Sequence, residues 1–419
     1  MSQFTHAHGA EQTPIGLYIH IPFCARKCPY CDFNTYAGLG SLHERTVDAL
    51  CRELTFWGRQ LDDRSVTSIF LGGGTPTVLS HSMLQRLMNT VYAAFALSEH
   101  CEVTVEANPG TVDRGKFRTL GELGVNRLSI GVQSFQAQEL RFLGRIHGTD
   151  DVYAAYEAAR AAGFDNINLD FMFGLPNQKR ADWDETLAQA VALEPDHLSL
   201  YSLIVEPDTP LFEWVDSGSV PEPDDDLAAE LYETAMERLA TGGYTQYEVS
   251  NWARTVDTQK TGRQTVPMLA CRHNLLYWRN QEYVGIGPGA HSHLRERVGD
   301  GAIVSRRWSN VKPVLDYASR VETDLTAIEN GEVVRGRASM GETMMLGLRL
   351  VNEGVSYQRF ERMHGAPLKE IFGTELRTLQ NQRLIAMDAD RVRLTRRGLM
   401  IGNQVFAAFL PDAADAMAA

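Results

Sequence analysis

The sequence predicts an α/β protein with two parts: a partial barrel of parallel strands, and a smaller C-terminal α+β domain of winged-helix-like type. Three observations support this prediction. Short apolar runs alternate with longer amphipathic runs from Gly16 to about Leu239, and polar or glycine-rich motifs follow the apolar runs. Near Gly331 the pattern changes to helical stretches followed by a hairpin.

Six apolar runs, rich in Val, Ile, Leu, Tyr and Phe, have the length and composition of strands. They lie at residues 16–21, 66–72, 101–107, 127–133, 166–172 and 197–203. Helical segments with apolar residues three and four apart lie between them, at residues 41–60, 80–96, 151–162 and 180–193. Because right-handed crossovers place each new strand parallel to the last, we expect a partial (β/α)6 barrel. A flat, doubly wound sheet stays open as the alternative.

The expected domain boundaries follow these changes in pattern. They are a disordered N-terminus at 1–14, the partial barrel at 15–253, a loop and connecting region at 254–330, the C-terminal domain at 331–410 and a disordered tail at 411–419. The polar stretch 254–270 is expected to be an exposed loop. Winged-helix-like units can read DNA, but in enzymes they more often serve in packing or partner contact.

Composition excludes several classes of protein. The 419 residues carry a net charge of −13, so a general affinity for nucleic acid is not expected. No apolar run approaches the roughly 20 residues needed to span a bilayer. The N-terminal "MSQFTHAHGAEQTP" lacks the apolar core of a signal peptide, so we expect a cytoplasmic protein. Six cysteines, three of them clustered, do not form a disulfide framework.

The clustered cysteines are Cys24, Cys28 and Cys31, in the segment "HIPFCARKCPYCDF" directly after the first predicted strand. Three thiolates suit two kinds of metal site. A zinc ion would need a fourth ligand, for which His20 is a candidate. An iron-sulfur cube held by only three cysteines would keep one iron open to a small chelating molecule. The remaining cysteines are best explained as small buried side chains, with Cys271 the least certain because of its neighbours.

Further polar groups follow the next predicted strands. "GGGTPT" occupies residues 72–77, and Glu106, Gln133, Arg145 and Asp170 lie at or after the later strands. Singly, each could be a tight turn, a helix cap or a surface group. Because the C-terminal edges of barrel strands converge, their shared placement favours one pocket. Glycines allow close backbone approach to a ligand, and an arginine can pair with a carboxylate through two hydrogen bonds.

The C-x3-C-x2-C spacing, with Tyr30 before the last cysteine, resembles the signature of radical S-adenosylmethionine (SAM) proteins. The resemblance implies that Cys24, Cys28 and Cys31 hold a 4Fe-4S cluster in a barrel of the radical SAM type. It also implies that the open iron chelates the amino and carboxylate groups of SAM. An electron from the cluster then splits the sulfonium bond and yields a 5′-deoxyadenosyl radical.

A narrower resemblance covers about Leu17 to Leu294. The motifs "YIHIPFC", "GGGTPT", "EANPG", "SIGVQSF", "LGRIH", "DFMFGLP" and "YEVSNWAR" are similar to those of the oxygen-independent coproporphyrinogen III oxidase family and its close relatives, the HemW heme chaperones. The resemblance implies a SAM site formed by Tyr18, Gly74, Thr75, Glu106, Gln133, Arg145 and Asp170. Gly73 and Tyr30 match positions around a second SAM in the oxidase. Phe173 stands where a tyrosine is expected.

Two features separate the chaperones from the oxidases. The oxidase carries a further cysteine where this chain has Phe33, and it has a longer N-terminal segment. "CRHNLLYW" contains H-N-x-x-Y-W, which resembles the heme-binding motif of the chaperones and implies His273 as a heme-binding residue. Without the resemblance, a histidine satisfied by backbone at a turn is the better explanation. His291 and His293, in "GPGAHSHL", are the next candidates.

The hypothesis from sequence is therefore a heme chaperone with a 4Fe-4S cluster, SAM and heme. Its implied partners are a heme acceptor, such as a respiratory hemoprotein, and an electron donor for the cluster. Members of this family can also associate with membranes when loaded. The alternative is oxygen-independent oxidative decarboxylation of coproporphyrinogen III, so enzyme activity is left open.

Overall fold

The structure is a computed structural model that describes residues 14–256, 265–297 and 303–411. The two predicted disordered ends therefore lie outside the described residues, apart from Pro14 and Pro411. Within the described ranges, none of the helices combines the length and the hydropathy of a bilayer-spanning segment.

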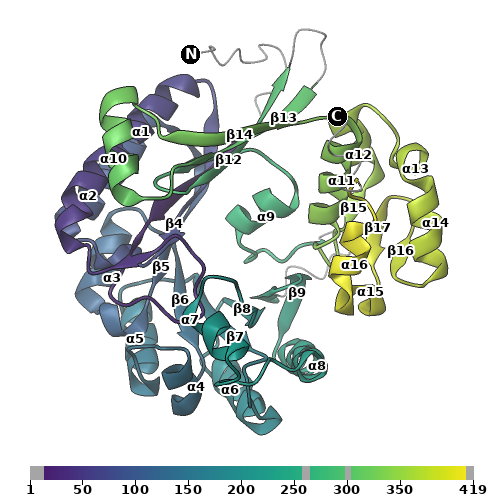
Figure 1. Ribbon diagram of the computed structural model, residues 1–419, viewed down its shortest axis with the longest axis horizontal. Helices are drawn as coiled ribbons and strands as arrows, with labels where there is room; N and C mark the ends of the chain where they lie inside the picture. The colour runs from purple at the N-terminus through teal and green to yellow at the C-terminus, as the bar shows by residue number, and fades with distance from the viewer. Residues whose placement is uncertain (1–13, 257–264, 298–302, 412–419) are drawn as a thin grey trace.

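The six predicted strands are present and run parallel. They are β1 (Ile15–Ile21), β4 (Ser65–Gly73), β5 (Ala96–Ala107), β6 (Arg127–Gln133), β7 (Ile167–Phe173) and β8 (His197–Ser202). The helices between them cover the outer face: α1 (His43–Gln60), α2 (His81–Ala94), α3 (Arg114–Glu122), α4 (Ala137–Phe142), α5 (Thr149–Ala161) and α6 (Arg180–Ala192). The strands curve around a central space without closing, which confirms the predicted partial barrel (Figure 1).

Successive side chains along each strand point to opposite faces of the sheet, and this alternation explains the arrangement. In β1, Leu17 and Ile19 are buried in the core between the sheet and the outer helices. The side chains of Tyr18 and His20 lie on the other face and line a cavity. A strand with apolar residues on one face and polar residues on the other places functional groups inside the barrel, while its outer face stabilises the fold.

The sheet continues beyond the six strands at both edges. β11 (Tyr283–Ile286) pairs in parallel with β1, and three antiparallel strands follow it: β12 (His291–Arg297), β13 (Ile303–Asn310) and β14 (Ile328–Val334). At the other edge, β10 (Asn251–Arg254) and β9 (Tyr244–Glu248) follow β8. The region expected to be loop and connection, residues 254–330, thus supplies three strands and the start of β14, which continues past the expected boundary at 331. β11 pairs with β1, which lies far away in sequence, and β12 to β14 are polar, so they lack the apolar pattern that predicts the other strands.

Four helices complete this part of the molecule. α7 (Pro210–Asp216) and α8 (Asp225–Thr241) follow β8, and α10 (Val314–Asp324) packs against α1. The short helix α9 (Arg272–Trp278) lies across the opening of the barrel and contacts β4 (Figure 1). This placement brings the H-N-x-x-Y-W motif to the inside of the barrel.

The C-terminal part has its own apolar core. Its elements are α11 (Gly336–Gly347), β15 (Val355–Ser356), α12 (Tyr357–His364), α13 (Leu368–Ile371), α14 (Gly373–Asn381), β16 (Ile385–Met387), β17 (Arg391–Leu394), α15 (Arg396–Met400) and α16 (Gly402–Ala407). The predicted hairpin is the antiparallel pair β16–β17. The helix expected after it is divided at Ile401 into α15 and α16. Tyr232 and Met236 of α8 pack against both cores.

Candidate functional site

The cysteine loop leaves the C-terminal end of β1. Its two ends are held together by a parallel pair of short strands, β2 (Phe23–Cys24) and β3 (Tyr36–Ala37). Inside the loop, the amide of Cys31 donates to the carbonyl of Cys28 at 3.2 Å. The side chains of Cys24, Cys28 and Cys31 are all partly exposed. The loop therefore presents three accessible thiols at the barrel edge where the strands end.

Each of these thiols has a polar neighbour, which comes from other segments for Cys24 and Cys28 and from the loop itself for Cys31. The hydroxyl of Thr75 donates to Sγ of Cys24 at 3.6 Å, and Arg145 Nη1 donates to Sγ of Cys28 at 3.7 Å. Sγ of Cys31 lies 3.9 Å from the hydroxyl of Thr35. Burial raises the pKa of Cys24 and of Cys31, so these thiols need a metal or other positive charge to become thiolates. Donors to sulfur fit thiolates that are bound to iron.

His20 does not offer a free nitrogen as a fourth ligand. Its Nε2 donates to the carbonyl of Asn34 at 2.9 Å, so its Nδ1 accepts from the hydroxyl of Tyr18 at 2.9 Å. Among the described residues, no three His, Cys, Asp or Glu side chains surround a single ion position. A 4Fe-4S cube binds its thiolates at separate iron corners, so three thiols without a protein fourth ligand suit it.

The glycine turn after β4 is shaped by close contacts that exclude side chains. Gly73 has φ +95°, and a Cβ there would lie 2.2 Å from Nδ1 of His20. A Cβ on Gly74 would lie 2.6 Å from the carbonyl oxygens of Ile21 and Phe23. The amide of Gly74 donates to Ile21 at 2.9 Å. The turn is thus fastened to the start of the cysteine loop with its backbone open to a ligand.

Glu106, at the end of β5, faces the same cavity. Its Oε2 accepts a hydrogen bond from the amide of Gly73 at 3.0 Å. Burial, and then the charge of Asp170, raises the pKa of Glu106 to about 8. A carboxyl group in this state becomes a carboxylate when a cationic ligand such as an ammonium group binds beside it.

Asn108 connects two of the predicted site residues and was not predicted itself. Its Nδ2 donates to the hydroxyl of Thr75 at 2.7 Å, and its Oδ1 accepts from Arg145. Arg145 also donates to the carbonyl of Gly131 at 2.7 Å. The sequence feature that could have identified Asn108 is its position two residues after Glu106, in the motif "EANPG". The result is a continuous network from β4 through β5 to the sulfur of Cys28.

Three other predicted residues lie near this network but are not among the residues that line the cavity. Gln133 ends β6 with φ +72°, at a register shift against β7. Asp170 accepts hydrogen bonds from Ser129 at 3.0 Å and Asn168 at 2.8 Å, and burial raises its pKa. Tyr30 is partly buried against an apolar cluster, and burial raises its pKa.

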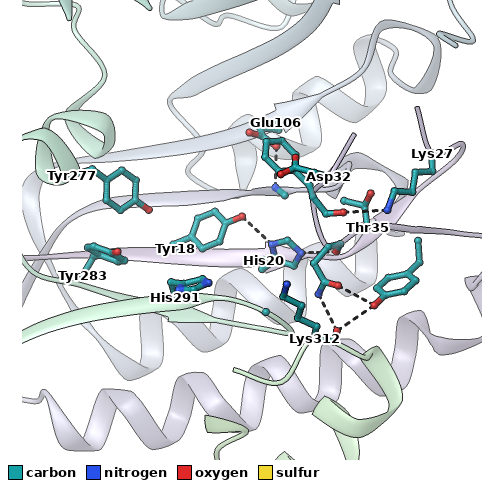
Figure 2. Close-up of a pocket in the computed structure, with 15 residues that line it drawn as sticks. Tyr18, His20, Lys27, Asp32, Thr35, Glu106, Tyr277, Tyr283, His291 and Lys312 are labelled. Atoms are coloured by element: carbon teal, nitrogen blue, oxygen red, sulfur yellow. Dashed lines mark hydrogen bonds between the residues drawn. The ribbon is translucent and has the colours of Figure 1, made fainter. Parts of the chain in front are cut away.

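The cavity has a volume of about 550 Å³ and two chemically different sides. Figure 2 shows its lining. It is lined by Tyr18, His20, Lys27, Asp32, Phe33, Asn34, Thr35, Tyr36, Gly73, Glu106, Tyr277, Tyr283, Gly289, His291 and Lys312. One side consists of cysteine-loop residues and the predicted SAM residues Tyr18, Gly73 and Glu106. The other side consists of aromatic rings, an imidazole and a lysine from α9, β11, β12 and the segment before α10.

His273 lies behind this second side and is only 1% exposed. Its Nδ1 lies 2.9 Å from the hydroxyl of Ser68, and its Nε2 lies 2.9 Å from the hydroxyl of Tyr277. Its ring stacks on Phe70 with centroids 5.3 Å apart. Burial, and then Arg127, lowers the pKa of His273 to about 3. The structure thus places Tyr277, and not His273, on the cavity wall.

Two segments of the chain match known families. Residues 18–190 match the radical SAM superfamily, and residues 337–401 match the HemN C-terminal domain. The first match covers the cysteine loop, the glycine turn and all the residues predicted to hold SAM. The second covers most of the C-terminal part.

Curated relatives match over two thirds of the chain or more. The heme chaperone HemW of Bacillus subtilis is 38% identical over 396 residues, which are 94% of this chain and 99% of that protein. The heme chaperone HemW of Escherichia coli is 44% identical over 284 residues, 67% of this chain and 70% of that protein.

A solved structure shows the same fold. The coproporphyrinogen III oxidase HemN of Escherichia coli superposes with a TM-score of 0.77, over 94% of this chain and 90% of that one. At 22% sequence identity, that likeness describes the fold and not the activity.

Proposed function

Because this chain belongs to the HemW heme chaperone family and carries a radical SAM domain, we propose that it binds heme and passes it to an acceptor protein. The observation that carries the proposal is the two-sided cavity of about 550 Å³. One side is suited to a cluster-bound SAM, and the other has the aromatic rings, imidazole and cation that suit a heme. The two groups would therefore lie next to each other.

The cysteine loop holds the 4Fe-4S cluster of this proposal. Cys24, Cys28 and Cys31 supply three thiolates, and the fourth iron is left for SAM. When bound, the cluster supplies electrons. The chain's own contribution is to hold the loop by the β2–β3 pair and to direct Thr75 and Arg145 at the sulfurs.

The SAM site of the proposal comprises Tyr18, Tyr30, Gly73, Gly74, Thr75, Glu106, Gln133, Arg145 and Asp170. The glycine turn offers backbone groups, and Glu106 accepts from the ammonium group of SAM. Arg145 orients the ligand through Asn108, and Asp170 is suited to ribose hydroxyls. In this arrangement burial excludes water around Glu106 and Asp170 and strengthens their hydrogen bonds to a ligand.

Heme in this proposal lies against α9, next to His273. Cytoplasmic location, a reductant for the cluster and peripheral membrane contact of the loaded form belong to the proposal as well. The exposed Phe33 occupies the position at which the oxidases carry a further cysteine, and this argues against porphyrinogen decarboxylation.

The test uses the full chain, reconstituted without oxygen. Iron and sulfide analysis with electron paramagnetic resonance should detect a cluster that Cys24→Ser abolishes and Cys51→Ser leaves intact. The native protein should bind heme in an absorption titration and transfer it to an apo-hemoprotein. Decarboxylation of coproporphyrinogen III, or failure to bind heme, would overturn the proposal.

A further inference from the structure

An imidazole that binds heme iron must present an unshared nitrogen to the cavity. The ring of His273 is enclosed, and both its nitrogens have hydroxyl partners. His20 lines the cavity, but both of its nitrogens are engaged as well. His293 is buried, and its Nδ1 lies 3.0 Å from the carbonyl oxygen of Gln281. The remaining histidine on the cavity wall, among the described residues, is His291.

His291 has the properties that the others lack. Its side chain is exposed and lines the cavity, beside Tyr18 and Lys312 (Figure 2). Its ring makes no hydrogen bond to any other residue in the described part of the chain. The ring is exposed at the cavity but partly enclosed by the wall behind it, and this partial desolvation, followed by the charges of Lys312 and Arg307, lowers its pKa, which keeps the imidazole neutral near pH 7. A neutral imidazole with a free lone pair is the form that coordinates iron.

The turn before His291 holds it in place. Gly287 has φ +109°, and a Cβ there would lie 2.6 Å from the carbonyl oxygen of His20. Gly289 has φ +72°, and a Cβ there would lie 2.9 Å from Nδ2 of Asn34. His291 then starts β12 opposite Ser309 of β13. A residue at the start of a paired strand has a restricted direction, so the imidazole is directed into the cavity.

Asn34 of the cysteine loop positions the lysine as well as the turn. Its Nδ2 donates to the carbonyl of Pro288 at 3.0 Å and to the carbonyl of Lys312 at 2.9 Å. The side chain of Lys312 is exposed on the cavity wall (Figure 2), with no ion-pair partner among the described residues. A lysine in this position can pair with a carboxylate on a ligand whose metal lies at His291.

We propose that His291 is the axial ligand of the heme iron and that Lys312 pairs with a heme propionate. The inference rests on the proposed heme binding and names the residues that carry it out. Tyr277 and Tyr283 form the flank of the site, with ring centroids 4.6 Å apart at 90°. His273 is then a positioning residue, which holds the hydroxyl of Tyr277 from behind.

The main experiment compares His291→Ala with His81→Ala in the reconstituted full chain. His81 is an exposed histidine on the outer helix α2, so it is a matched control. Ferric and ferrous heme are titrated and followed by absorption and electron paramagnetic resonance. His291→Ala should weaken heme affinity at least about tenfold and remove the imidazole-ligand spectrum. Free imidazole should restore that spectrum, because the substitution leaves room beside the iron.

A second comparison tests the lysine. Lys312→Ala should weaken heme binding without changing the ligand spectrum, and Lys312→Arg should retain most of the affinity. With the dimethyl ester of heme, which has no propionate charge, native protein and Lys312→Ala should bind equally.

Three outcomes would contradict the inference. A native spectrum and affinity in His291→Ala, with both lost in His273→Ala, would assign the iron to His273 while heme binding itself stands. Unequal binding of the dimethyl ester by native protein and Lys312→Ala would exclude the propionate pair. Failure of the native protein to bind heme would overturn both the proposed function and this assignment.

Discussion

The hydroxyl of Tyr277 lies 2.9 Å from Nε2 of His273, four residues earlier on the same helix, and closes that imidazole off from the cavity. Tyr277→Phe would leave a buried polar nitrogen without its partner. We expect a loss of about 1–2 kcal/mol in the free energy of unfolding, measured by urea denaturation. Tyr283→Phe is the control, because no hydrogen bond of its hydroxyl to another described residue is present and the ring remains. Equal losses in the two variants would contradict the structural role of this pair.

Alanine substitutions at Gly73 and Gly163 distinguish the effect of a steric clash from that of backbone strain. Both have φ +95°, but a Cβ on Gly73 would lie 2.2 Å from His20, whereas nothing lies within 4 Å of one on Gly163. Alanine at either position should cost about 1–2 kcal/mol of stability through the unfavourable φ. Only Gly73→Ala should also weaken SAM binding, by about tenfold or more in calorimetry. If Gly163→Ala weakened SAM binding as much, the effect would come from strain and not from the site.

Arg145 should affect both the cluster and the SAM site. Arg145→Gln removes the donor to Sγ of Cys28 and the contacts to Asn108 and Gly131. Because hydrogen bonds to sulfur stabilise the reduced cluster, its reduction potential should become more negative. SAM affinity should fall by about tenfold, since a charged hydrogen bond contributes roughly 1.5–3 kcal/mol.

The exposed Arg141, on the neighbouring helix α4, provides the control for this substitution. Arg141→Gln should leave the potential and the SAM affinity at native values. A redox titration followed by electron paramagnetic resonance measures the potential. An unchanged potential in Arg145→Gln would show that the arginine does not act on the cluster.

Glu53 should make stability depend on pH. It is buried in α1 and accepts hydrogen bonds from Tyr317 at 2.7 Å, Asn310 at 2.8 Å and the amide of Gly287 at 2.9 Å. Burial raises its pKa from 4.5 to about 7. A raised folded-state pKa means that the protonated group stabilises the fold. This contribution is complete below pH 4.5 and is lost as the pH rises through about 7.

The size of this loss is on the order of 3 kcal/mol, from the shift between the two pKa values. Thermal unfolding of the native protein across pH 5–8 measures this loss of stability. Because glutamine does not ionise, Glu53→Gln should remove most of the pH dependence that Glu53 causes. Glu99→Gln, at an exposed position, should leave the slope unchanged. A slope that persists in Glu53→Gln would have to come from other buried carboxyl groups, for which Glu106, Asp170 and Glu248 are candidates.

The sequence predicted the barrel because parallel strands have a strong local pattern. Apolar runs such as Leu17 to Ile21 show their buried face directly, and the motifs after each run indicate the shared edge. The strands β11 to β14 were not predicted. β11 pairs with a strand far away in the chain, as Tyr283 does with Gly16, whereas β12 to β14 pair with their neighbours in sequence but are too polar for the local pattern to indicate strands.

By itself, the sequence determined that three thiols stand on one short loop after the first strand, with glycines and carboxyls after the next strands. The placement of these groups depends on the spacing of residues along the chain. Only the tertiary structure decided which histidine faces the cavity. Burial of His273 depends on Ser68, which is 205 residues earlier, and exposure of His291 depends on a turn tied to Asn34. Ligand access is a property of surfaces brought together by folding, and the order of residues along the chain does not carry it.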